Sequence, residues 1–75
     1  MDQGIRRTFD INPDGVWVVV KWEDFVVGSS FFVPCINTKR CVQQVKDVVT
    51  PRGYDIVQNV TVENDRLGVR IWRLL

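Results

Sequence analysis

The sequence contains no histidine, only two cysteines and no long hydrophobic run, and its net charge is +1. Without histidine, the usual acid/base group at neutral pH is missing, so we do not expect an enzyme. Two thiols cannot complete a tetrahedral zinc site in one chain, and we expect no metal and no cofactor. The adjacent acids Glu23–Asp24 and the pair Glu63 and Asp65 leave a metal–carboxylate site as the alternative, although such acids are more often solvated turn residues.

The charge and hydropathy patterns also bear on location. A net charge of +1 provides no global attraction to nucleic acid or to an anionic membrane, so any basic site must be local. No segment reaches the ~18 apolar residues of a membrane span, and the first residues lack the apolar core of a secretory signal. We therefore expect a cytoplasmic protein without a membrane partner. In that setting Cys35 and Cys41 are expected to be reduced and to fill the core, with a disulfide between them as the alternative.

With 75 residues, the chain has room for one domain. We divide it into a partly flexible N-terminal arm at residues 1–15 and a single α+β domain at residues 16–75. The arm ends in the turn signal Asn12–Gly15, and we expect Phe9 and Ile11 to hold it against the core.

One stretch, Thr38–Gly53, has a clear helical period. Its apolar residues recur with the spacing of one helix face: Cys41, Val42, Val45, Val48 and Val49. Asn37 or Thr38 can cap the start, and Pro51 followed by Gly53 is typical of a helix end.

Two cations, Lys39 and Arg40, fall in the first turn of this helix, where the helix dipole disfavours positive charge. They are either solvated side chains or part of an anion site that they would share with the free amides of the turn.

The rest of the chain has the composition of strands. Four runs are predicted as strands: Val16–Trp22, which is the strongest, Phe31–Ile36, Tyr54–Glu63 and Arg66–Leu74. Pro34 predicts that the second run lies at a sheet edge or ends there, and the last two runs form an antiparallel hairpin. The order β-β-α-β-β predicts an α+β fold, in which one helix packs on one face of an antiparallel sheet of about four strands.

Alternation along these strands assigns residues to the two faces of the sheet. The helix is expected to cover Val18, Val20, Ile56, Val60, Val69 and Ile71. The opposite face is expected to carry Trp17, Lys21, Val57, Asn59, Thr61, Arg70 and Trp72. One of Phe31 and Phe32 joins it, and which one depends on the register of their strand.

This uncovered face has two familiar uses. Bases of single-stranded nucleic acid could stack on Trp17 and Trp72, while the backbone phosphates contact Lys21, Lys39, Arg40 and Arg70. Alternatively the face binds a protein, by self-association or by inhibition of a host factor, since tryptophan and arginine concentrate at interface hot spots. A third possibility is that the N-terminal arm covers it. We prefer nucleic-acid binding, with a homodimer as the expected assembly.

Two short phrases resemble small uncharacterised proteins of tailed bacteriophages. These phrases are Gly28–Cys35 (GSSFFVPC, with one serine more than the usual Gly-Ser-Phe-Phe-Val-Pro) and Leu67–Arg73 (LGVRIWR). The resemblance implies a phage origin and action in the cytoplasm of a bacterial host, and it fits both binding hypotheses. No functional residue is carried over from it.

Overall fold

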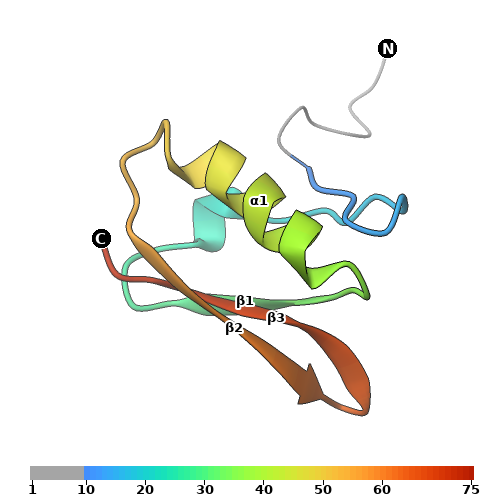
Figure 1. Cartoon of the computed structure of the whole chain (residues 1–75). Coiled ribbons are helices and arrows are strands. Elements are labelled where there is room, and N and C mark those ends of the chain that lie inside the picture. The colour runs from blue at the N-terminus through green and yellow to red at the C-terminus, as the bar shows by residue number, and fades with distance from the viewer. Residues whose placement is uncertain (1–9) are drawn as a thin grey trace.

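The computed structural model describes residues 10–75, and in this range it contains a short 3-10 helix, one α-helix and three strands. In chain order these are η1 (Trp22–Asp24), β1 (Ser30–Pro34), α1 (Thr38–Val49), β2 (Ile56–Glu63) and β3 (Arg66–Arg73). The strands form an antiparallel sheet in the order β1–β3–β2, and α1 lies across one face of it (Figure 1). The predicted α+β class is confirmed, but the sheet in this part of the chain has three strands and not about four.

The helix α1 begins where its sequence pattern predicts. The side-chain Oδ1 of Asn37 accepts a hydrogen bond from the backbone N–H of Arg40 at 3.1 Å, which makes Asn37 the N-cap. At the other end, the N–H of Thr50 still donates to the carbonyl of Lys46, and Gly53 then adopts a φ of 74°. Such a left-handed residue past a helix end is the role predicted for this glycine.

The hairpin of β2 and β3 is closed by a two-residue turn. Asn64 and Asp65 both have positive φ, at 52° and 63°, and they connect the last pair of the ladder, Glu63 with Arg66. This turn has the twist that an antiparallel hairpin prefers, and it fixes the register of the two strands. Because residues directly opposite each other share a face, the register also fixes which side chains face α1.

The core lies between the sheet and α1. Val33, Val69 and Ile71 project from the sheet and are fully buried. The remaining buried hydrophobic residues come from α1 and from the segments that flank β1: Ile11, Val20, Trp22, Phe25, Cys35, Cys41, Val45 and Val49. A core assembled from all of these elements supports a single packed unit in the described chain.

The helix covers only part of its side of the sheet. Figure 1 shows the end of the β2–β3 hairpin extending beyond α1. Val60 and Val62 lie on the helix side of the sheet, opposite Val69 and Leu67, yet they are 53% and 63% exposed. The predicted face of Val60 is therefore right, but its side chain stays exposed because α1 does not reach it.

The predicted strand Val16–Trp22 is wrong. Its only ladder contact among the described residues is an isolated bridge between Ile11 and Val18. The N–H of Trp22 bonds to the carbonyl of Val20 at 3.0 Å, so the chain turns there and enters η1. The turn allows the side chains of Trp22 and Phe25 to be buried. Trp22 packs edge-to-face on Phe25 and, at 5.7 Å between ring centroids, on Phe31. Aromatic packing has overridden the β propensity of the run.

The turn predicted at Asn12–Gly15 is present, with the N–H of Gly15 bonded to the carbonyl of Asn12 at 3.0 Å. Asn12 and Gln44 exchange two hydrogen bonds at 2.7 and 2.9 Å, which join this turn to α1. Ile11 is buried in the core, as expected. Residues 1–9 of the predicted arm, including Phe9, lie outside the described residues.

Candidate functional site

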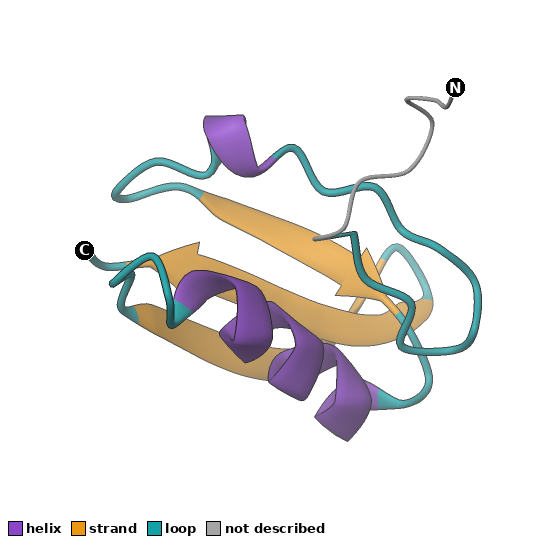
Figure 2. Ribbon diagram, turned by 90° about the horizontal axis from the view of Figure 1, so that it is seen from above, coloured by secondary structure: helices purple, strands orange, loops and turns teal. Residues whose placement is uncertain are grey.

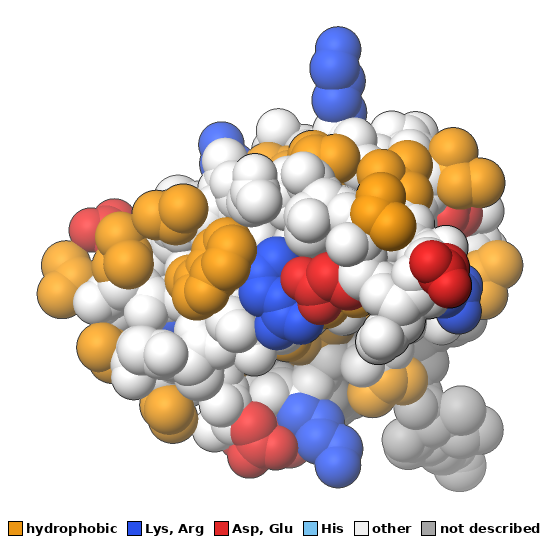
Figure 3. Space-filling model, turned by 90° about the horizontal axis from the view of Figure 1, so that it is seen from below, with side chains coloured by type: hydrophobic (Ala, Val, Ile, Leu, Met, Phe, Trp, Pro, Cys, Tyr) orange, Lys and Arg blue, Asp and Glu red, His pale blue; other side chains and the backbone are white. Residues whose placement is uncertain are grey.

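The second face of the sheet is not covered by any element of residues 10–75, and we call it the open face. Figure 2 shows α1 on the side of the sheet opposite to it. The strand registers place eleven residues on this face: Ser30, Phe32, Pro34, Val57, Asn59, Thr61, Glu63, Arg66, Gly68, Arg70 and Trp72. Figure 3 views it from below, and hydrophobic side chains lie around adjacent basic and acidic groups. The open face is thus a mixed surface with aromatic, apolar and paired charged groups.

Trp72 and Val57 form the apolar part of the open face. They lie directly opposite each other on β3 and β2, and they are 36% and 46% exposed. On its other side Trp72 is paired with Ser30 of β1, a small side chain. The indole is therefore flanked by one branched aliphatic and one small polar neighbour, and more than a third of its surface remains open to a binding partner.

The charged part of the open face is an ion pair between Arg70 and Glu63. Arg70 donates from Nε to Oε2 of Glu63 at 2.8 Å and from Nη2 to Oε1, and its Nη1 donates to Oγ of Ser30 at 3.0 Å. The guanidinium also lies 5.7 Å from the ring centre of Phe32. The hydrogen bonds lower the pKa of Glu63 and raise that of Arg70. All three nitrogens of this guanidinium already have partners within the chain.

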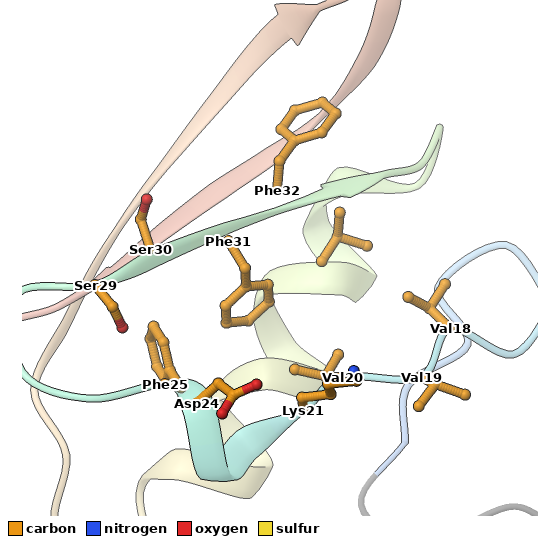
Figure 4. A pocket seen from close by; sticks show the side chains of 11 residues that line it. Val18, Val19, Val20, Lys21, Asp24, Phe25, Ser29, Ser30, Phe31 and Phe32 are labelled. Carbon is orange, nitrogen blue, oxygen red and sulfur yellow. The ribbon is translucent and has the colours of Figure 1, made fainter.

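Phe32 belongs to the open face, whereas Phe31 points the other way. The two side chains leave β1 on opposite sides in Figure 4. Phe31 points into a groove of about 210 Å³ between β1 and the segment Val18–Lys21. Lys21 and Asp24 are the charged residues among those that line the groove, and its walls are otherwise apolar or carry serine. General acid/base catalysis by two carboxylates would need a second acid in this groove, and its lining contains one acid and one cation.

The structure does not bring the six predicted site residues together. Arg70 and Trp72 share the open face, as expected. Trp17 and Lys21 do not, because the strand that would have carried them is absent, and Figure 4 shows Lys21 on the helix side of β1. Lys39 and Arg40 lie in the first turn of α1, exposed, on the helix side of the sheet.

The start of α1 offers few amides to an external anion. The carboxylate of Asp14 accepts hydrogen bonds from the N–H groups of Ile36 and Asn37, at 2.9 and 2.8 Å, and these bonds lower its pKa. The N–H of Arg40 is bonded to Asn37. The place that an anion would take beside Lys39 and Arg40 is therefore held in part by a carboxylate of the chain itself.

Sequence reasoning missed the partners of Arg70. The register pairs Glu63 with Arg66 and pairs Arg70 with Asn59. Arg70 and Glu63 are therefore not directly opposite each other, and only the length of their side chains lets them meet. The alternation of residues along the strands does not predict this contact. Ser30 precedes the predicted strand Phe31–Ile36, so its contact with Arg70 had no signal in the sequence.

Both cysteines are free and buried. Burial raises the pKa of Cys41 to about 12, and burial also raises the pKa of Cys35. Such protonated thiols are poor nucleophiles and poor metal ligands. Among residues 10–75 no group of three or more Cys, His, Asp or Glu side chains is arranged to hold a metal ion.

No protein-family model, no curated protein and no solved structure matches this chain. In the described part of the chain, no helix has both the length and the apolar character needed to cross a membrane.

Proposed function

We propose that this chain is a small non-enzymatic module that binds another protein through its open face. One observation supports this most directly. Trp72 and Val57 are exposed side by side, while Arg70, two residues from Trp72 on β3, is hydrogen-bonded to Glu63 and Ser30 and lies over the ring of Phe32. An exposed tryptophan beside an internally neutralised arginine is suited to an apolar, desolvated contact.

Nucleic-acid binding, the alternative, requires cations that are free to contact phosphates close to the stacking surface. Arg70 would have to leave Glu63 for this, and Arg66, the other cation of the open face, lies at the opposite end of β3 from Trp72. Lys39 and Arg40 lie on the helix side of the sheet. This separation of the stacking group from the helix cations favours a protein partner. If the predicted phage origin and cytoplasmic setting hold, that partner would be a protein of the bacterial host.

The first test compares two substitutions of the same kind. Val57→Lys adds a cation to the open face, and Val26→Lys adds one at a similarly exposed valine in the turn before β1. Both variants are used with the wild type to isolate a partner from an extract of the producing cell, and binding is then measured with the purified partner. We expect Val57→Lys and Trp72→Ala to weaken binding strongly and Val26→Lys to leave it unchanged. Equal binding by all four proteins would refute the proposal.

The second test uses labelled single-stranded DNA, duplex DNA and RNA, titrated with the protein at two salt concentrations and followed by fluorescence anisotropy. We expect no salt-sensitive binding, because Arg70 is paired with Glu63 and the other cation of the open face, Arg66, lies at the opposite end of β3 from Trp72. Salt-sensitive binding at micromolar concentration or tighter that is lost in Trp72→Ala would overturn the protein proposal and establish the nucleic-acid alternative.

A further inference from the structure

β2 is an outer strand of the sheet, and its free edge faces solvent in the described structure. The order β1–β3–β2 leaves one side of its eight residues without a neighbouring strand. The N–H and C=O of Asp55 bond to the chain that continues β3, at Leu75 and Leu74. Since bonding direction alternates along an antiparallel strand and the register is uninterrupted, the odd residues of β2 bond to β3. The backbone groups of the even residues, from Ile56 to Val62, therefore point outward.

This edge lacks the features that usually keep sheet edges apart. Between Ile56 and Val62 there is no charged residue and no proline, and five of the seven residues are β-branched. No bulge interrupts the ladder. By contrast β1, the other outer strand, is five residues long and carries Pro34, which cannot donate a backbone hydrogen bond. Natural proteins usually protect a long regular edge with lysine, proline or a bulge when it is not meant to pair.

Exposed apolar side chains accompany the free edge. Val60 and Val62 lie on the helix side but beyond the reach of α1, and both are more than half exposed. A strand added to this edge would place side chains beside these valines and remove their apolar surface from water. The edge and its flank therefore favour the same kind of ligand, an extended uncharged strand with β-branched residues.

We propose that the ligand is β2 of a second copy, paired antiparallel about a twofold axis. β2 itself has the properties that this edge favours in a ligand. Ile56–Val62 is an uncharged strand rich in β-branched residues, with outward bonding groups at its even residues. A twofold axis perpendicular to the sheet keeps both α1 helices on one side and joins the two open faces on the other. The interface is isologous, and it pairs the free β2 edges of both copies. The other outer strand, β1, is short and contains Pro34, and it remains outside the interface. Assembly therefore stops at two copies.

Charge selects the register of this pairing. If Asn59 were centred on the axis, Asp55 of one copy would face Glu63 of the other. A shift that centres Val60 keeps the outward bonding groups paired and sets Glu63 opposite Val57 instead. Asp55 then comes level with Asp65, but Asp65 lies in the hairpin turn beyond the end of β2, so no two acids face each other within the paired strands. The dimer therefore has Val60 of the two copies facing each other and forms a continuous six-stranded sheet.

The test is the mass of the full chain in solution. Sedimentation velocity over a hundredfold range of concentration should give a species of twice the 8.7 kDa chain mass. Val60→Lys places two like charges opposite each other and should raise the dimer dissociation constant about tenfold or more, as should Val62→Lys. Val26→Lys and Val27→Lys, at valines that are 55% and 60% exposed and outside β2, are the matched controls and should remain dimeric.

Several outcomes would overturn the proposal: a wild type that is monomeric throughout, polymers larger than a dimer, or a Val60→Lys variant that dimerises as well as Val26→Lys. Circular dichroism of each variant checks that the fold is kept, which is expected because the replaced side chains are already exposed. As a second measurement, Val60→Cys should form an intermolecular disulfide under mild oxidation, since facing residues in a bonded pair lie within disulfide reach. Absence of that cross-link would also refute the pairing. Neither result depends on Trp72, so failure here is distinct from failure of the proposed function.

Discussion

Replacing Gly68 with alanine tests the packing of β1 against β3. Gly68 is the third residue of β3, opposite Pro34 at the end of β1, and it is buried on the open face. A Cβ atom at this position would lie 2.2 Å from the carbonyl oxygen of Val33, 2.8 Å from Cα of Pro34 and 2.6 Å from Cζ of Phe32. Two of these three atoms belong to the backbone and cannot rotate away. The substitution must therefore push the strands apart.

The expected cost follows from these distances. Ordinary contact begins near 3.4 Å, so the strands would have to separate locally by more than an ångström. A ladder bond at 3.0 Å, such as that from the N–H of Cys35 to the carbonyl of Leu67, would then exceed hydrogen-bonding range. Overpacking together with such a loss costs about 3 kcal/mol or more. A chain of this size has a total stability of about 4–11 kcal/mol, and its Tm should fall by about 12–24 °C.

Thermal unfolding followed by circular dichroism measures this effect, with Gly53→Ala as the matched control. Gly53 has open space around its Cα but a φ of +74°, so alanine there should cost only ~1 kcal/mol of backbone strain. If Gly68→Ala melts at or above the temperature of Gly53→Ala, the reasoning from close backbone packing is wrong. Adding Phe32→Leu should rescue little, because the backbone contacts persist. A nearly full rescue would show that the ring of Phe32, and not the backbone of β1, is the obstacle.

Two further predictions concern groups with shifted pKa values. The pKa of Asp14 is held below its ordinary value of 3.8 in the folded state, so its bonds to Ile36 and Asn37 stabilise the fold above that value and are lost as the pH falls through the folded pKa. Urea unfolding from about pH 6 to about pH 2 should show this loss as a fall in the free energy of unfolding. Asp14→Asn should be less stable than the wild type at the upper end of this range, and its free energy of unfolding should vary less with pH. Parallel pH profiles of the two proteins would contradict the assignment. Cys35 and Cys41, protonated and buried, should not react with a disulfide reagent at neutral pH until urea unfolds the chain. Rapid reaction of both thiols in the native protein would show that the core is open.

The parts of the fold that follow from local rules were predictable. The helix at Thr38–Val49 has a regular apolar face, a cap at Asn37 and a stop signal, and each of these acts within a few residues. The hairpin follows from alternation on both sides of Asn64–Asp65. Pro34 correctly indicated an edge strand. In these elements local preference and tertiary packing agree.

The failures occur where tertiary packing decides. Val16–Trp22 has the strongest β composition in the chain, but Trp22 is 3% exposed and is held among other rings at the start of η1. It packs on the rings of Phe25 and Phe31. The β propensity of a run contains no information about such tertiary ring contacts. For the same reason only two of the six predicted site residues share the open face. Arg70 and Trp72 share a face because they are two residues apart on one strand, whereas Trp17 and Lys21 depended on a strand that is absent.

The contact of Asp14 with the start of α1 has a consequence for how the chain folds. The first turn of α1 contains no acidic residue and two cations, so its electrostatics oppose helix formation by the segment alone. The missing negative charge comes from Asp14, 22 or 23 residues earlier in the chain. Helix formation and docking of the N-terminal turn should therefore be one cooperative event. A peptide of residues 37–53 would remain mostly unfolded in water, and deleting the turn would destabilise a helix that it precedes by more than twenty residues.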